Sequence, residues 1–191
     1  EVNRFRWWCA TLRPVVRGEV GCVLSHVKIY RLMAARGEKV AAGFEDDVIL
    51  SGAAVRALAA AEAACLGDPR RTKRGEELAA ADAEVAVEPT AWDFCSEGYV
   101  IGIEAAKAIA KVQSRVITTP DAWGYHNHKG WIRLARITPP VSQQAVDAFE
   151  SDLGVRYSVA GKGLVERCWW KLRRVVGMLV DCILDGGRRG W

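Results

Sequence analysis

The chain has 191 residues, of which 50% are hydrophobic and 26% are charged, and its formal net charge is +4. This length suits one domain with a substantial core. The sequence holds no run of the roughly 20 apolar residues that a membrane span needs, and its start lacks the apolar stretch of a signal peptide. The charge is too small to argue for nucleic-acid binding by itself.

The six cysteines are scattered and include no C-x-x-C pair, so their spacing fits neither a zinc knuckle nor a compact disulfide framework. Isolated cysteines of this kind usually act as small core residues. We therefore expect reduced thiols in a cytoplasmic protein.

The first half of the chain predicts a helix and then a strand. Apolar residues recur at helical spacing over residues 22–36, and Gly37 is a suitable C-cap. Gly18 and Gly21 are expected to form a tight turn before this helix. Residues 39–44 are short and apolar, as in a buried strand, and Gly43 within it permits close approach of another group.

The predicted strand leads directly into Glu45, Asp46 and Asp47. Adjacent carboxylates repel one another, and burial of an unpaired charge is costly. A divalent cation such as Mg²⁺ or Mn²⁺ relieves both effects, and these hard ions often accompany the phosphates of a substrate. The alternative is a solvated turn in which the acids cap a helix.

Further elements follow at intervals that favour an α/β fold. Ser51 is placed to cap a helix over residues 53–66, and residues 67–75 read as a polar, basic loop. Strands are expected over residues 84–87, 99–101 and 131–137, with a helix over residues 104–112. The basic residues of the loop are Arg70, Arg71, Lys73 and Arg74, and a solvated surface explains them better than a nucleic-acid track does, so no nucleic-acid partner is expected.

The tail differs in composition, so we divide the chain into residues 1–160 and a basic amphipathic helix and tail over residues 161–191. Residues 164–184 place Arg167, Lys171 and Arg174 along one face. Such a helix can lie on an anionic membrane surface. It can equally be a terminal helix that packs on the core.

Several segments together resemble one family. The string Gly18-Glu19-Val20-Gly21-Cys22-Val23-Leu24-Ser25-His26 precedes Glu45-Asp46-Asp47 by one helix and one strand. Weaker segments follow in order at residues 97–101, 105–107, 119–121, 139–143 and 151–154. Over residues 17–156 this order resembles glycosyltransferase family 25, the lipopolysaccharide biosynthesis glycosyltransferases of bacteria.

The resemblance implies a GT-A-like, Rossmann-like α/β fold. It also implies transfer of a sugar, often galactose, from a UDP-sugar to a lipopolysaccharide or other cell-surface glycan. In that fold Mn²⁺, or Mg²⁺, lies between an acidic motif and the donor diphosphate. Asp47 is then the first choice as metal ligand, and Glu45 is either a second ligand or, like Asp46, a contact to the donor ribose or a metal-bound water. The acceptor would be a glycan or lipid-linked saccharide. The protein itself is expected in the cytoplasm, with peripheral contact to the inner face of the cytoplasmic membrane as one option.

Four further residues of the motif segments receive substrate-binding roles from the resemblance: Glu19, Ser25, Tyr99 and Gln143. Glu19 can alternatively be a turn residue held by backbone amides, and Ser25 a helix cap. His26 is a fifth candidate for substrate binding, and a structural histidine is the alternative.

Asp121 is the candidate catalytic base, because an attacking hydroxyl must lose its proton to a carboxylate. Trp123 offers an aromatic face for a sugar. The alternative is a helix start in which Asp121 caps and Trp123 packs in the core. His126 and His128 can add a nitrogen ligand to the metal, or they can be exposed loop residues.

The beginning of the chain departs from the family. A strand and helix normally precede the glycine-rich motif, whereas residues 1–17 here are rich in Trp and Arg. We therefore expect a fold without the first βα unit, in a fragment or in a truncated chain of impaired activity. The alternative function is an inactive remnant that binds a glycan or a membrane surface.

Overall fold

The computed structural model describes residues 1–11, 14–74, 84–91, 93 and 97–145. It is an α/β structure, as predicted. Its helices are α1 (Arg4–Thr11), α2 (Arg17–Arg36), α3 (Ala54–Gly67), α4 (Ile103–Val112) and α5 (Trp123–His128). Its strands are β1 (Val40–Phe44), β2 (Val48–Leu50), β3 (Arg71–Arg74), β4 (Ala86–Pro89), β5 (Gly98–Gly102), β6 (Arg133–Thr138) and β7 (Ser142–Gln144).

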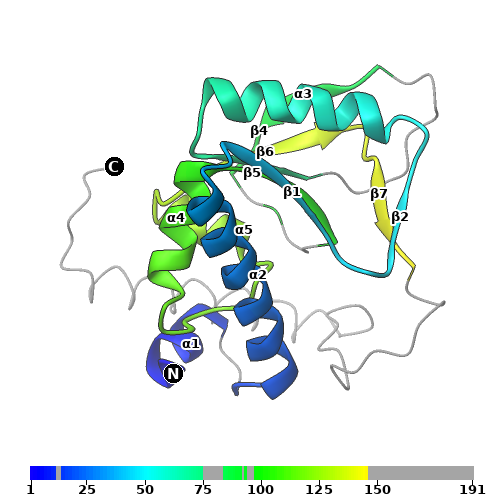
Figure 1. Ribbon diagram of the computed structural model, residues 1–191. Coiled ribbons are helices and arrows are strands. Elements are labelled where there is room, and N and C mark those ends of the chain that lie inside the picture. The colour runs from blue at the N-terminus through cyan, green and yellow to red at the C-terminus, as the bar shows by residue number, and fades with distance from the viewer. Residues whose placement is uncertain (12–13, 75–83, 92, 94–96, 146–191) are drawn as a thin grey trace.

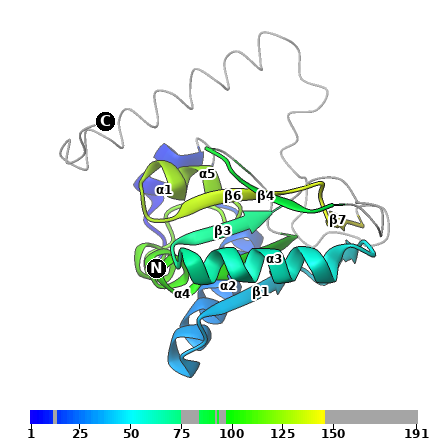
Figure 2. The same cartoon turned by 90° about the horizontal axis from the view of Figure 1, so that it is seen from above.

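Five strands form one mixed sheet in the order β1-β5-β3-β6-β4, with β1 and β4 at its opposite edges (Figure 2). Only β3 and β6 run parallel. A separate antiparallel ribbon joins β2 to β7. Figure 1 shows α3 on one face of the large sheet and α2 and α4 on the other, so helices cover both faces.

Strand β5 lies between these two helical layers, and all five of its residues are buried. Tyr99 and Ile101 pack in the cluster formed with α2 and α4, whereas Val100 packs against α3. This alternation follows from the period of two in a strand. A strand buried on both faces reads as a continuous apolar run, which is why it was predictable from the sequence.

Helix α2 ends as predicted, because Gly37 takes a left-handed φ of 71° and its N–H reaches the carbonyl of Ala34. Its start differs from the prediction. The helix begins at Arg17, so Gly18 and Gly21 lie within it and form no tight turn. The added residues 17–21 are stabilised by packing, since Val20 packs against the buried cluster that contains Trp7 of α1.

Most other predicted elements are present, with shifted boundaries. The helices over 53–66 and 104–112 are α3 and α4, and the strands over 39–44, 84–87 and 131–137 are β1, β4 and β6. Ser51 does not cap α3 itself, because its Oγ accepts from the N–H of Ala53, the residue before the helix, at 3.3 Å.

One prediction in this region is wrong. Residues 71–74 do not belong to a polar loop but form β3, which pairs with both β5 and β6. Its neighbours in the sheet are distant in sequence, so the local polar composition does not reveal the pairing. Strands β2 and β7 were not predicted either, because each has three residues.

At the N-terminus, Arg4–Thr11 form helix α1. Val2 makes an isolated bridge to Val116, and Trp7 is fully buried. The predicted helix over residues 164–184 and the tail over 161–191 lie outside the described residues. None of the helices that the structure describes is long and apolar enough to cross a membrane.

Candidate functional site

The acidic triplet forms the turn between β1 and β2, and backbone bonds hold it from two sides. The N–H of Glu45 donates to the carbonyl of Glu97 at 3.0 Å, and the carbonyl of Asp47 accepts from the N–H of Ala145 at 2.8 Å. Glu45 and Asp47 are half-buried, whereas Asp46 is exposed. These bonds fix both ends of the turn, so Glu45 and Asp47 are held against the protein while Asp46 faces solvent.

Gln144 connects the two half-buried carboxylates, those of Glu45 and Asp47. Its Nε2 lies 2.7 Å from Oδ2 of Asp47 and 3.5 Å from Oε2 of Glu45. The other oxygen of Asp47, Oδ1, is buried and has no hydrogen-bond partner among the described residues. A buried carboxylate oxygen without a donor is costly, and a cation would satisfy it.

Helix α2 brings the Gly18–His26 segment close to the acidic turn. Cys22 and His26 are four residues apart and so lie on one face of the helix. The Sγ of Cys22, a ring nitrogen of His26 and a carboxylate oxygen of Glu45 all lie within 4.8 Å of one another. The two motifs that carried the family resemblance therefore meet in space.

Tyr99 of β5 holds the histidine. Its hydroxyl lies 2.8 Å from Nδ1 of His26. Its ring packs edge-on against Tyr30, with centroids 6.2 Å apart, and lies tilted against the ring of Trp123, with centroids 5.1 Å apart. Burial raises the pKa of Tyr99 to about 12, so the hydroxyl stays protonated at neutral pH.

Gly43 makes room for this tyrosine. The two residues are paired across β1 and β5, and a Cβ at Gly43 would come within 2.4 Å of Cζ of Tyr99. The sequence predicted close backbone approach at Gly43, whereas the group that approaches it is the side-chain ring of Tyr99.

Negative charge collects around Cys22. Burial, followed by the carboxylates of Glu45, Asp121 and Glu19, raises the pKa of its thiol to about 11. Burial lowers the pKa of His26, and Asp121 opposes that shift. Asp121 therefore lies close enough to act on both α2 side chains, and the neutral histidine faces a group of carboxylates.

The remaining candidates behave as follows. Ser25 is exposed, and its hydroxyl donates to the carbonyl of Gly21 at 3.1 Å within the helix, so it caps nothing. Trp123 is 1% exposed and packs in the core, which is the alternative that the sequence left open. Asp121 does not cap α5, because the N-cap is Ala122 and no side chain bonds there. Gln143 is exposed on β7.

The two histidines of α5 take different positions. His126 is fully buried, with both ring nitrogens lacking a hydrogen-bond partner among the described residues, and His128 is exposed. Within the described part of the chain, the only group of at least three possible metal ligands is Cys22, His26 and Glu45, so neither histidine joins it. They lie in helix α5, not in a loop.

Sequence reasoning missed two residues of this site. Gln144 contacts the carboxylates, whereas the predicted Gln143 lies beside it on the strand and faces away, as strand alternation requires. Cys22 was interpreted as a core residue. The signal for Cys22 was its spacing of four from His26 on a predicted helix.

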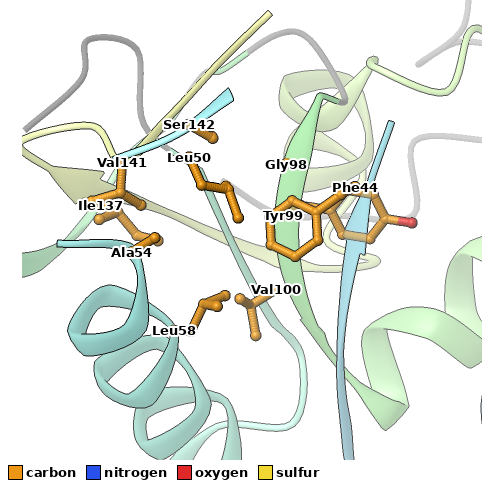
Figure 3. Close-up of a pocket in the computed structure, with 10 residues that line it drawn as sticks. All are labelled: Phe44, Leu50, Ala54, Leu58, Gly98, Tyr99, Val100, Ile137, Val141 and Ser142. Atoms are coloured by element: carbon orange, nitrogen blue, oxygen red, sulfur yellow. The ribbon is translucent and has the colours of Figure 1, made fainter. Parts of the chain in front are cut away.

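An apolar pocket lies next to the acidic turn, between α3 and the sheet (Figure 3). Its lining is Phe44, Leu50, Ala54, Leu58, Gly98, Tyr99, Val100, Ile137, Val141 and Ser142. Figure 3 shows the hydroxyl of Tyr99 pointing away from Leu58 and Ile137. The pocket thus borders the polar site through Tyr99 and contains none of its carboxylates.

The fold and this site define an α/β protein with a carboxylate turn at the end of a strand. Residues 6–68 match the family model of glycosyltransferase family 25 (LPS biosynthesis protein). The match contains both Gly18–His26 and Glu45–Asp47, so it confirms the resemblance for this part of the chain. It covers less than half of the 191 residues. No curated protein matches the chain.

Proposed function

We propose that this chain is a metal-dependent glycosyltransferase of lipopolysaccharide or other cell-surface glycan assembly, with the GT-A arrangement of its sheet. The observation that carries the proposal is the meeting of the two matched motifs, which places Cys22 and His26 of α2 beside Glu45 of the acidic turn.

The acidic turn suits a hard divalent cation, Mn²⁺ or Mg²⁺. The evidence is the buried Oδ1 of Asp47, which lacks a donor among the described residues. Asp47 and Glu45 would hold the ion. A cation there supplies Lewis-acid stabilisation of the charge that develops on a departing nucleoside diphosphate. Gln144 keeps the two carboxylates oriented toward one another.

Asp121 is the proposed base, which accepts the proton of the attacking acceptor hydroxyl. In support, it is half-buried and acts electrostatically on Cys22 and His26, so it faces the same site as the acidic turn. The proposed donor is a UDP-sugar, with UDP-galactose as first choice. The proposed acceptor is a lipid-linked saccharide at the cytoplasmic face of the membrane.

The test measures UDP release and sugar transfer with UDP-galactose or UDP-glucose, a truncated lipooligosaccharide acceptor and Mn²⁺. The matched variants are Asp47→Asn and Glu62→Gln, which remove one negative charge each, the second on the exposed face of α3. Loss of a metal ligand removes several kcal/mol of transition-state stabilisation, so Asp47→Asn should lower turnover by roughly 100-fold or more. Glu62→Gln should transfer like the parent.

Equal transfer by Asp47→Asn and the parent contradicts the assignment of the acidic turn. Absence of both UDP binding and transfer in the parent, together with binding to glycan or to anionic vesicles, favours the alternative of a non-catalytic binding module. Calorimetry with UDP and Mn²⁺ separates these outcomes, since micromolar binding supports the enzyme.

A further inference from the structure

The cluster of Cys22, His26 and Glu45 combines sulfur, nitrogen and oxygen ligands, a set that differs from the all-oxygen set of the acidic turn. Their ligand atoms lie within 4.8 Å of one another. Around a tetrahedral zinc ion, ligand atoms lie about 3.3 to 3.6 Å apart, from bonds of about 2.0 to 2.3 Å. Small side-chain rotations would bring the three groups to that spacing.

The backbone already supports such a site. Cys22 and His26 lie one helical turn apart in α2, and Glu45 directly follows β1. Its N–H bond to Glu97 holds the beginning of the turn against the residue before β5. The three ligands thus come from regular elements or their immediate ends, which keeps them close without a bound ion.

A second layer of groups orients the histidine. Nδ1 of His26 lies 2.8 Å from the hydroxyl oxygen of Tyr99. When Nδ1–H donates to that oxygen, Nε2 carries the lone pair that a metal needs. Gly43 and Tyr30 in turn hold the tyrosine ring. Histidines that bind metals usually have their second nitrogen held in this way, and that contact tunes metal affinity.

The charge of the surroundings favours a cation. Besides Glu45, the carboxylates of Asp121 and Glu19 act on Cys22. Cys22 and Glu45 are each half-buried, so solvent reaches the cluster and a fourth position remains open. Thiolate and imidazole ligands select zinc and similar transition metals over Mg²⁺ or Mn²⁺.

We propose that Cys22, His26 and Glu45 form a binding site for Zn²⁺ or a similar thiophilic divalent ion, with water in the fourth position. Binding releases the proton of the Cys22 thiol to solvent, and the bound thiolate bonds the metal. The site shares Glu45 with the acidic turn but does not depend on the proposed transferase activity.

The test is titration of the purified chain with Co²⁺ alone, a spectroscopic substitute for zinc. The expected spectrum has a thiolate-to-cobalt charge-transfer band in the near ultraviolet and intense visible bands of a tetrahedral site, all abolished by excess Zn²⁺. Cys22→Ser should lose the charge-transfer band. Cys65→Ser, a change at a buried cysteine of α3, should keep it.

Tyr99→Phe separates a positioning role from a merely structural one. It removes the hydroxyl on Nδ1 of His26 and keeps the ring, so zinc affinity should fall by about 10- to 100-fold while the charge-transfer band remains. Unchanged affinity would contradict the role of Tyr99 in orienting the ligand.

A parent chain without the charge-transfer band overturns the proposal, as does a band that persists in Cys22→Ser. If Cys22→Ser does not fold, chemical protection of the parent chain is measured instead. Zn²⁺ should protect Cys22 from alkylation by iodoacetamide, as mapped by mass spectrometry. Equal labelling of Cys22 with and without zinc would refute the site. The cobalt titration contains no sugar donor, so a negative result would not affect the transferase proposal. In the same way, a failure of sugar transfer would not affect the proposed zinc site.

Discussion

His126 is a polar side chain in an apolar place, and its replacement by leucine should stabilise the protein. The imidazole is fully buried in α5, packs against Trp131 at a centroid distance of 5.6 Å and against Tyr125 at 5.9 Å, and has no hydrogen-bond partner among the described residues. A buried polar group of this kind costs about 1–3 kcal/mol. His126→Leu should raise the free energy of unfolding at pH 7 by an amount of that order.

At acid pH, His126 has a larger effect on the free energy of unfolding. Burial lowers the pKa of His126 from 6.5 to about 3. Between these pH values the unfolded chain binds a proton that the folded chain does not, so stability falls as the pH drops from 6.5 toward 3. At about 1.4 kcal/mol per pH unit, the full interval corresponds to about 5 kcal/mol, and the first two units below 6.5 to nearly 3 kcal/mol. Above pH 6.5 this contribution is constant.

The assay is urea unfolding of the parent and of His126→Leu at several pH values from 7.5 to 4.5. The difference between the two unfolding free energies should grow as the pH falls. His128→Leu, at the exposed histidine of the same helix, is the matched control and should follow the parent. A constant difference between parent and His126→Leu across this range would refute the reasoning, because it would mean that the imidazole titrates alike in both states.

Three further outcomes are expected. Gly43→Ala should cost about 1–3 kcal/mol in thermal unfolding, since the new methyl group meets the ring of Tyr99; an unchanged melting temperature would contradict the close approach. Gln113→Leu should cost at least about 2 kcal/mol, because the buried amide bonds one backbone N–H and one backbone carbonyl that the variant leaves unsatisfied; a neutral result in urea unfolding would speak against these bonds. Gln144→Leu should raise the Mn²⁺ concentration needed for half-maximal transfer, because Asp47 loses the amide that orients it; an unchanged metal requirement would remove Gln144 from the site.

Elements with a complete local signal were predictable. The end of α2 was visible in the change from helical periodicity to Gly37, and β5 was visible as an apolar run. The start of α2 was not, because its extra turns depend on burial against Trp7, a residue outside the helix. Strand β3 was not predictable, since its hydrogen bonds go to β5 and β6, which lie far along the chain.

The same distinction holds for the site. The string Gly18–His26 and the acidic triplet could be recognised from residue types and order alone, and the family match over residues 6–68 agrees. The choice between Gln143 and Gln144 could not be made, because it depends on which face of the β2–β7 ribbon lies toward the carboxylate of Asp47. The sequence also could not show that His126 is buried and His128 exposed, because the elements that pack on α5 decide which of its faces is buried.

The sequence by itself thus determined helices α2 to α4, every strand of the large sheet except β3, and the position of the acidic triplet. These follow from neighbours within about one helical turn or one strand. The order of the motifs along the chain gave the family resemblance. Only the tertiary structure decided that Cys22, His26 and Glu45 meet, that Tyr99 lies over Gly43, and that the buried His126 has no hydrogen-bond partner within the described ranges. The physical reason is that these contacts are made between residues remote in sequence, and packing of the whole sheet and its helices determines which of them form.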